Sequence, residues 1–111
     1  MKKPTKALSI RQPYAEQILR GTKRIEFRSL RTHIRERVHI YASKTAGDEK
    51  EFRKLGLLEG DLPTGVIVGT VEIVGCSGND ERYRWHLARP ERAKRLIKPK
   101  RQPQPVWFTP F

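Results

Sequence analysis

The chain has 111 residues, of which 36% are hydrophobic and 8% aromatic, which is enough for one compact domain with a modest core over residues 1–111. No run of about 18 apolar residues occurs, which excludes a membrane-spanning helix, and the basic start MKKPTK lacks the apolar segment of a signal peptide. Cys76 is the only cysteine; it excludes an intramolecular disulfide and a cysteine-rich metal site, and a cytoplasmic location fits best.

The charge of the chain is large and unevenly distributed. It carries 24 Lys and Arg residues against 12 Asp and Glu, a net charge of +12. Residues 1–46 contain 12 basic and 3 acidic residues (net +9), residues 47–80 contain 3 and 7 (net −4), and residues 81–101 contain 9 and 2 (net +7). Two basic segments around an acidic one favour a polyanion as partner, so we predict binding to RNA or single-stranded DNA. An anionic membrane surface is the alternative, but no amphipathic helix with bulky apolar residues supports it.

The first 28 residues predict a strand, a short helix and a second strand. Residues 6–10 form the first strand, and an apolar stripe then predicts a helix over residues 13–20 that begins at a proline and ends at Gly21. Residues 24–28 alternate between polar and apolar side chains. We therefore expect Ile25 and Phe27 to face the core, and the three charged residues of this strand to share the opposite face.

The rest of the chain predicts three more strands and two more helices. The expected ranges are a strand over 38–43, a charged helix over 47–56, a strand over 65–75, a helix over 81–87 and an edge strand over 105–111. Gly69 marks a bend or bulge in the long strand. Residues 88–105 are rich in proline and basic side chains, so we expect an extended basic arm across the surface.

Five to six short strands with two to three short helices predict an α+β fold, built on a small, strongly bent sheet or barrel. The helices are too few to cover both faces of a parallel sheet.

Three motifs in this frame resemble the signature of one family. They are LSIRQPYA at residues 8–15, GTKRIEFR at residues 21–28 and IYASK at residues 40–44. Together they resemble ASCH domains, the activating-signal-cointegrator-homology family of the PUA-like superfamily. The resemblance implies a PUA-like β-barrel with a cleft beside the first helix that handles nucleic acids or nucleotides. Members include RNA- or DNA-binding modules and very small enzymes, among them an amidohydrolase acting on N4-acylated cytidine and a ribonuclease.

The resemblance to the amidohydrolases implies a catalytic role for Lys23, the lysine of their G-x-K motif. A lysine partly shielded from water and near other cations can act as a base, and the alternative is a solvated lysine that binds phosphate. Glu26 stands where the best-known amidohydrolase has a threonine as nucleophile, so Glu26 would instead activate water or hold Lys23 or Arg28 in an ion pair. That enzyme also uses a glutamate from a later helix. Glu81 is the first candidate for this third group and Glu72 the second, although Glu72 could equally be an outward-facing strand residue.

Further polar and aromatic residues are candidates for binding a nucleoside or a nucleic acid. Those before the first helix would meet the free N–H groups at its start, which favour an anion. Tyr14 could stack on a base, although a place in the core is the alternative. One of the two arginines on the second strand is expected to pair with Glu26 and the other to contact phosphate. The full set is Ser9, Arg11, Gln12, Tyr14, Arg24, Arg28, Ser43 and Lys44.

The three histidines show neither metal-ligand spacing nor an accompanying carboxylate cluster, so we expect no metal and no cofactor. The expected partner is RNA or a cytidine-type nucleoside, and the expected assembly is a monomer or a weak dimer. Two functions stay open. One is hydrolysis of the exocyclic amide of N4-acylcytidine. The other is a non-catalytic RNA- or single-stranded-DNA-binding module, or a ribonuclease, that uses the same basic cleft.

Overall fold

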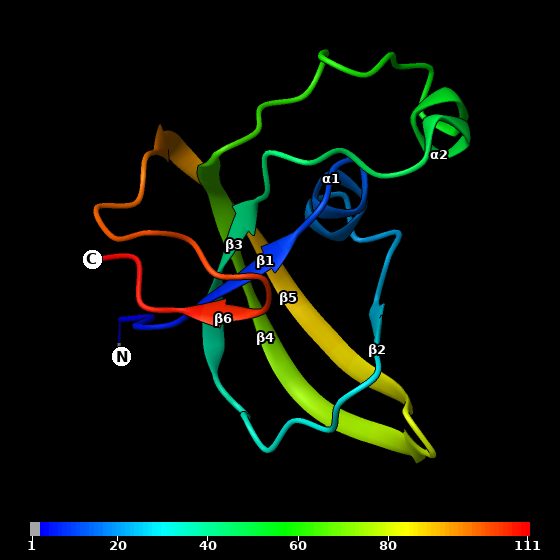
Figure 1. Cartoon of the computed structure of the whole chain (residues 1–111), viewed down its shortest axis with the longest axis vertical. Coiled ribbons are helices and arrows are strands. Elements are labelled where there is room, and N and C mark those ends of the chain that lie inside the picture. Colours follow the sequence, from blue (N-terminus) through cyan, green and yellow to red (C-terminus); the bar gives the residue numbers. More distant parts are fainter. Residues whose placement is uncertain (1–2) are drawn as a thin grey trace.

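The structure is a computed structural model that describes residues 3–111. Its elements in chain order are β1 (Ala7–Ile10), α1 (Tyr14–Leu19), β2 (Ile25–Arg28), β3 (Arg37–Ala42), α2 (Glu49–Lys54), β4 (Val66–Asn79), β5 (Arg82–Ile97) and β6 (Trp107–Phe108). The six strands form one sheet in the order β2-β5-β4-β3-β1-β6, curled into a half-barrel (Figure 1). The predicted α+β fold, a small PUA-like barrel of five to six strands with two to three short helices, is confirmed.

The core fills the inside of the curled sheet, and α1 packs against β3, β4 and β5. Side chains from every long strand meet there, because each strand alternates apolar residues toward this face. The α1 helix adds Ala15 and Ile18, which accounts for the stability of a helix too short to persist alone. The largest fully buried side chain is that of Trp85 on β5.

Gly69 allows two elements to approach the middle of β4. A Cβ atom at this position would collide with the carbonyl oxygen of Glu91 and lie 2.6 Å from Cδ2 of Leu19 on α1. The pairing of β4 with β5 also shifts register between Ile67 and Gly69. The predicted irregularity at Gly69 is therefore confirmed, and it helps the long hairpin to curve under α1.

The helix predicted over residues 81–87 is wrong. Strand β4 continues to Asn79, and β5 begins at Arg82, which pairs directly with Asn79. The two residues between them, Asp80 and Glu81, have positive φ angles of 50° and 62°, as a tight two-residue hairpin turn requires. Asn and Asp are common both at helix starts and in left-handed turns, so the Asn-Asp pair fits either structure.

The basic segment predicted as an arm is extended, but its first part belongs to the sheet. Strand β5 continues to Ile97 alongside β4, and only residues 98–106 lack regular structure before β6. Strand β2 pairs with β5 only as far as His86. Beyond that point β5 is an edge strand, where Pro90 can be accommodated without loss of a ladder hydrogen bond on its free side. The predicted final strand is confirmed at the opposite edge, where β6 pairs with β1.

The buried carboxylate of Glu16 connects α1 to the edge part of β5, at Arg92. The Glu16 carboxylate accepts hydrogen bonds from Arg92 at 2.8 and 3.0 Å and from Nε of Arg20 at 2.7 Å. The hydrogen bond from Arg92 is the main reason that the pKa of Glu16 lies below its ordinary value.

Within residues 3–111, no helix is long and apolar enough to cross a membrane.

We expect Glu16 to make the fold sensitive to acid. A carboxyl group with a lowered pKa stabilises the folded state above its ordinary pKa, and this contribution disappears as the pH falls through the folded-state pKa. The difference in unfolding free energy between the wild type and Glu16→Gln should therefore narrow from neutral pH to about pH 3. Urea unfolding at both pH values measures this difference. Glu59→Gln, which alters an exposed glutamate, is the control, and a difference that stays constant with pH would contradict the prediction.

Candidate functional site

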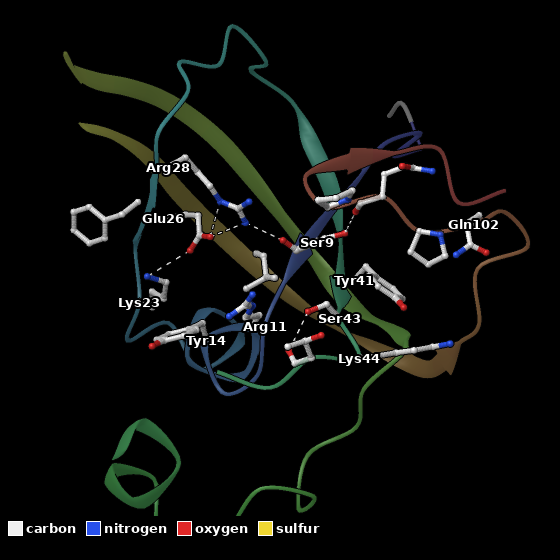
Figure 2. A pocket seen from close by; sticks show the side chains of 16 residues that line it. Ser9, Arg11, Tyr14, Lys23, Glu26, Arg28, Tyr41, Ser43, Lys44 and Gln102 are labelled. Carbon is white, nitrogen blue, oxygen red and sulfur yellow. Dashed lines mark hydrogen bonds and ion pairs between the residues drawn. The ribbon is translucent and has the colours of Figure 1, made fainter. Parts of the chain in front are cut away.

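A cleft of about 800 Å³ opens beside α1. Figure 2 shows its side chains converging from the ends of β1 and β3, from α1, from β2 and from the segment before β6. The residues that line it are Ser9, Ile10, Arg11, Tyr14, Lys23, Glu26, Phe27, Arg28, Tyr41, Ser43, Lys44, Thr45, Gln102, Pro103, Gln104 and Pro105. A volume of this size is in the range of pockets that hold small organic ligands.

The pairing of β1 with β3 builds one side of the cleft. These two strands are parallel, with Ile10 opposite Ala42, so the segments that follow them leave the sheet at the same end. Arg11 follows one strand, and Ser43 and Lys44 follow the other. The backbone N–H of Ser43 donates to the carbonyl of Ile10 at 3.0 Å, which holds the two strand ends together.

Three charged side chains meet at the opposite side. Oε1 of Glu26 lies 3.5 Å from Nζ of Lys23, and Oε2 of Glu26 lies 2.7 Å from Nη2 and 2.8 Å from Nε of Arg28. Arg28 also donates from Nη2 to the backbone carbonyl of Ser9 at 2.8 Å. The exposed fractions of the three side chains are only 17% for Lys23, 11% for Glu26 and 18% for Arg28. Shielding from water strengthens such charge-assisted contacts, so Glu26 is held firmly between two cations.

The predicted orientation of β2 is wrong for two residues. Phe27 was expected in the core but is 65% exposed at the cleft, whereas Glu26 is buried. Alternation shows that neighbouring residues of a strand face opposite ways, but it does not show which face is covered. Here Lys23 and Arg28 neutralise Glu26, which makes the burial of its carboxylate possible.

Lys23 also lies close to two aromatic rings. Its Nζ is 5.4 Å from the ring centroid of Tyr14 and 5.5 Å from that of Phe27. Tyr14 packs against the hydrophobic core and also lines the cleft, so both interpretations of this residue describe part of its environment. Burial, followed by the charge of Asp48, raises the pKa of the Tyr14 phenol, which keeps its hydroxyl neutral.

Four of the candidate residues do not line the cleft. Gln12 is buried, and its side chain donates to the carbonyl of Pro63 at 3.0 Å and accepts from the backbone N–H of Glu16 at 3.1 Å. Arg24 lines a separate cavity of about 260 Å³. The arginine that pairs with Glu26 is therefore Arg28. Glu81 occupies the exposed hairpin turn, so the reason for choosing it as the start of a helix no longer holds.

Glu72, the remaining candidate, belongs to a surface network away from the cleft. Its carboxylate pairs with Arg37 at 3.4 Å and accepts a hydrogen bond from Nε of Arg89 at 2.9 Å. The Arg89 guanidinium lowers the pKa of Glu72. Among residues 3–111, Glu26 is the only carboxylate that lines the cleft. The same range contains no group of three His, Cys, Asp or Glu residues placed to hold a metal ion.

One wall of the cleft, formed by residues 102–105, was not predicted from the sequence. The Ser9 hydroxyl donates to the carbonyl of Gln104 at 2.5 Å, and the Ser9 N–H donates to that of Val106 at 2.9 Å. These contacts join positions almost a chain length apart, so no local spacing could reveal them. Tyr41 was also missed, although it lies inside the IYASK motif.

Comparison with known proteins agrees with this architecture. The sequence model of the ASCH domain matches residues 8–103, most of the chain. The chain belongs to the ASCH domain family. Family membership connects the chain with RNA-related function.

Activating signal cointegrator 1 from Homo sapiens and its counterpart from Mus musculus are similar to this ASCH domain. Each is 35% identical to it over 80 residues, covering 62% of this chain and 14% of the relative. The chain therefore matches only a small part of these much longer proteins.

Proposed function

We propose that the cleft of this ASCH domain binds a cytidine-type nucleoside derived from RNA and hydrolyses the amide bond of an N4-acyl group. The observation that carries the proposal is the contact between Lys23 and Glu26 at 3.5 Å inside the cleft. The rings of Tyr14 and Phe27 beside Lys23 offer faces against which a flat base can stack. The resemblance of the G-x-K motif to that of the amidohydrolases supports the role of Lys23.

The reaction needs a base, a water molecule and a group that stabilises negative charge. In the proposed mechanism, Glu26 takes a proton from water as the water oxygen attacks the acyl carbon. The ammonium group of Lys23 stabilises the resulting oxyanion. The bond between the acyl carbon and N4 then breaks, and the proton passes from Glu26 to N4. The products are cytidine and the free carboxylic acid, and Arg28 holds the Glu26 carboxylate in position throughout.

A second candidate function is RNA binding without hydrolysis. The favouring observation is that both oxygens of Glu26 are already engaged by cations, while no other carboxylate within residues 3–111 lines the cleft. The net charge of +12 also suits a polyanion. In this alternative, Lys23 and Arg28 are part of a basic surface, and Glu26 serves to position them.

One assay separates the two candidates. Purified protein is incubated with N4-acetylcytidine, and the release of cytidine and acetate is followed by chromatography, with Lys23→Ala measured in parallel. The hydrolase proposal expects release by the wild type and little by the variant. Release by the wild type that does not exceed the level of the variant would overturn the proposal and leave the binding function.

RNA binding should weaken steeply as the salt concentration rises. Each phosphate contact to a single strand contributes about 0.7 to the slope of log affinity against log salt, because bound counterions are released. Gel-shift titrations of a short RNA at several salt concentrations measure this slope, and an uncharged oligonucleotide analogue of the same sequence is the control. Binding that does not change with salt, or equal binding of the analogue, would contradict an electrostatic interface.

A further inference from the structure

The charged groups of the cleft are divided between two places. Four cationic side chains and one carboxylate line it, and the carboxylate of Glu26 is bound by Lys23 and Arg28. The other two cations, Arg11 and Lys44, form no ion pair with any residue in the range 3–111. Both are exposed to solvent. The cleft therefore has one internally neutralised charge cluster and two further cations, Arg11 and Lys44, that are available to a ligand.

Backbone structure brings the main-chain positions of Arg11 and Lys44 to neighbouring strand ends. Arg11 and Lys44 follow β1 and β3, the two parallel neighbours in the sheet. The side chain of Lys44 packs along Gly65, where an added Cβ would lie 3.4 Å from its Cγ and Cε. Ser43 and Thr45, on either side of Lys44, also line the cleft and bring hydroxyl groups to the same place.

We propose that Arg11 and Lys44 form a phosphate-binding site, so that the ligand of the cleft is a phosphorylated nucleotide rather than a free nucleoside. This inference rests on the proposed function, because it takes the base to lie beside Lys23 and Glu26. In Figure 2 those two residues and Lys44 lie at opposite ends of the drawn set, with Arg11 and Ser43 between them. The exocyclic N4 and the 5′-phosphate also lie at opposite ends of a cytidine nucleotide. Both places line the same cleft of about 800 Å³, and we take one molecule to occupy both.

Phosphate recognition suits the chemistry of the pair. An arginine can donate two parallel hydrogen bonds to phosphate oxygens, and a lysine adds a compact positive charge. The same chemistry would accept a terminal monophosphate or a phosphodiester within an RNA strand. The two sources differ in charge and in the room that they need, so a comparison of ligands distinguishes them.

The test compares nucleoside and nucleotide affinities by isothermal titration calorimetry. The ligands are cytidine, cytidine 5′-monophosphate and a cytidine dinucleotide with an internal phosphodiester. The proteins are the wild type, Arg11→Gln, Lys44→Gln, the double variant and Lys50→Gln. Lys50 is an exposed lysine of α2 that does not line the cleft, so its variant controls for the loss of one charge. Thermal unfolding of each variant checks that the fold is retained.

We expect the wild type to bind the monophosphate or the dinucleotide about tenfold or more tightly than cytidine, as charge-assisted hydrogen bonds to phosphate imply. In the double variant this preference should fall towards one, while Lys50→Gln should keep it. A wild type that binds all three ligands equally would overturn the proposal, as would a Lys50→Gln variant that loses the preference to the same extent as the double variant. A preference for the dinucleotide over the monophosphate would show that the phosphate-binding site takes an internal phosphodiester.

Failure of this inference can be told apart from failure of the proposed function. If the wild type releases cytidine from N4-acetylcytidine but shows no preference for the phosphorylated ligands, the hydrolase proposal stands and the phosphate-binding proposal is overturned. If the wild type prefers the nucleotide but does not release cytidine from N4-acetylcytidine, and the double variant loses the preference, the phosphate-binding proposal stands and the hydrolase proposal is overturned. If none of the three ligands binds, the phosphate-binding proposal is overturned, and the release of cytidine from N4-acetylcytidine alone decides the hydrolase proposal.

Discussion

Replacing Glu26 by glutamine is expected to slow the release of cytidine from N4-acetylcytidine by about 100-fold or more, the usual effect of losing a general base. Glutamine has nearly the same size and can still accept a hydrogen bond from Arg28, but it cannot take a proton from water. The measurement is the kcat of the wild type and of Glu26→Gln under saturating substrate.

Two controls make this result interpretable. Glu26 is a buried carboxylate between Lys23 and Arg28, so its removal also leaves two cations without their counterion. Thermal unfolding of Glu26→Gln must therefore show that the variant is folded at the assay temperature. Glu59→Gln changes an exposed glutamate outside the cleft and should keep the wild-type kcat. A folded Glu26→Gln that hydrolyses the substrate at the wild-type rate would exclude Glu26 as the base.

Replacing Trp85 by alanine is expected to lower the free energy of unfolding by about 3–5 kcal/mol, the range observed for large aromatic residues in protein cores. The side chain is 1% exposed and stacks on Trp107, with ring centroids 5.6 Å apart. Its indole N–H donates to the carbonyl of Leu30 at 2.9 Å. The substitution removes apolar contacts, leaves a cavity and removes the hydrogen bond to the Leu30 carbonyl.

Urea unfolding of Trp85→Ala and Phe27→Ala provides a matched comparison, because both variants shorten an aromatic residue to alanine. Phe27 is 65% exposed, so its loss should change the unfolding free energy by about 0.5 kcal/mol or less. Equal costs for the two variants would show that the assigned core is wrong. The guanidinium of Arg28 also lies 5.6 Å from the Trp85 ring, so Trp85→Ala should disturb the contact that positions Glu26.

Sequence reasoning succeeded where the information is local. The first strand, the first helix and the cleft residues that follow them lie in one short stretch, where caps, glycines and apolar spacing define the structure. The same stretch brings Lys23, Glu26 and Arg28 within a few residues of one another, so their proximity follows from chain connectivity. The choice of Ser43 and Lys44 as binding candidates rested on the resemblance of the motif at residues 40–44.

Prediction from the sequence failed where contacts between residues far apart along the chain determine the structure. Strand β5 contains many charged residues and a proline, and its conformation depends on pairing with β4 rather than on its own pattern. The burial of Glu26 depends on two cations, and alternation alone placed Glu26 on the face opposite the core. The wall formed by residues 102–105 depends on contacts with Ser9, far away along the chain. Sequence spacing contains no measure of any of these three effects.

The short strand β6 has a consequence for the handling of this protein. It covers the outer edge of β1, and its neighbouring segment satisfies the N–H and the hydroxyl of Ser9. A chain trimmed before Trp107 would present β1 as an uncovered edge, which is a template for pairing with a second molecule. Such trimming should therefore promote self-association, whereas an affinity tag attached after Phe111 keeps the edge closed.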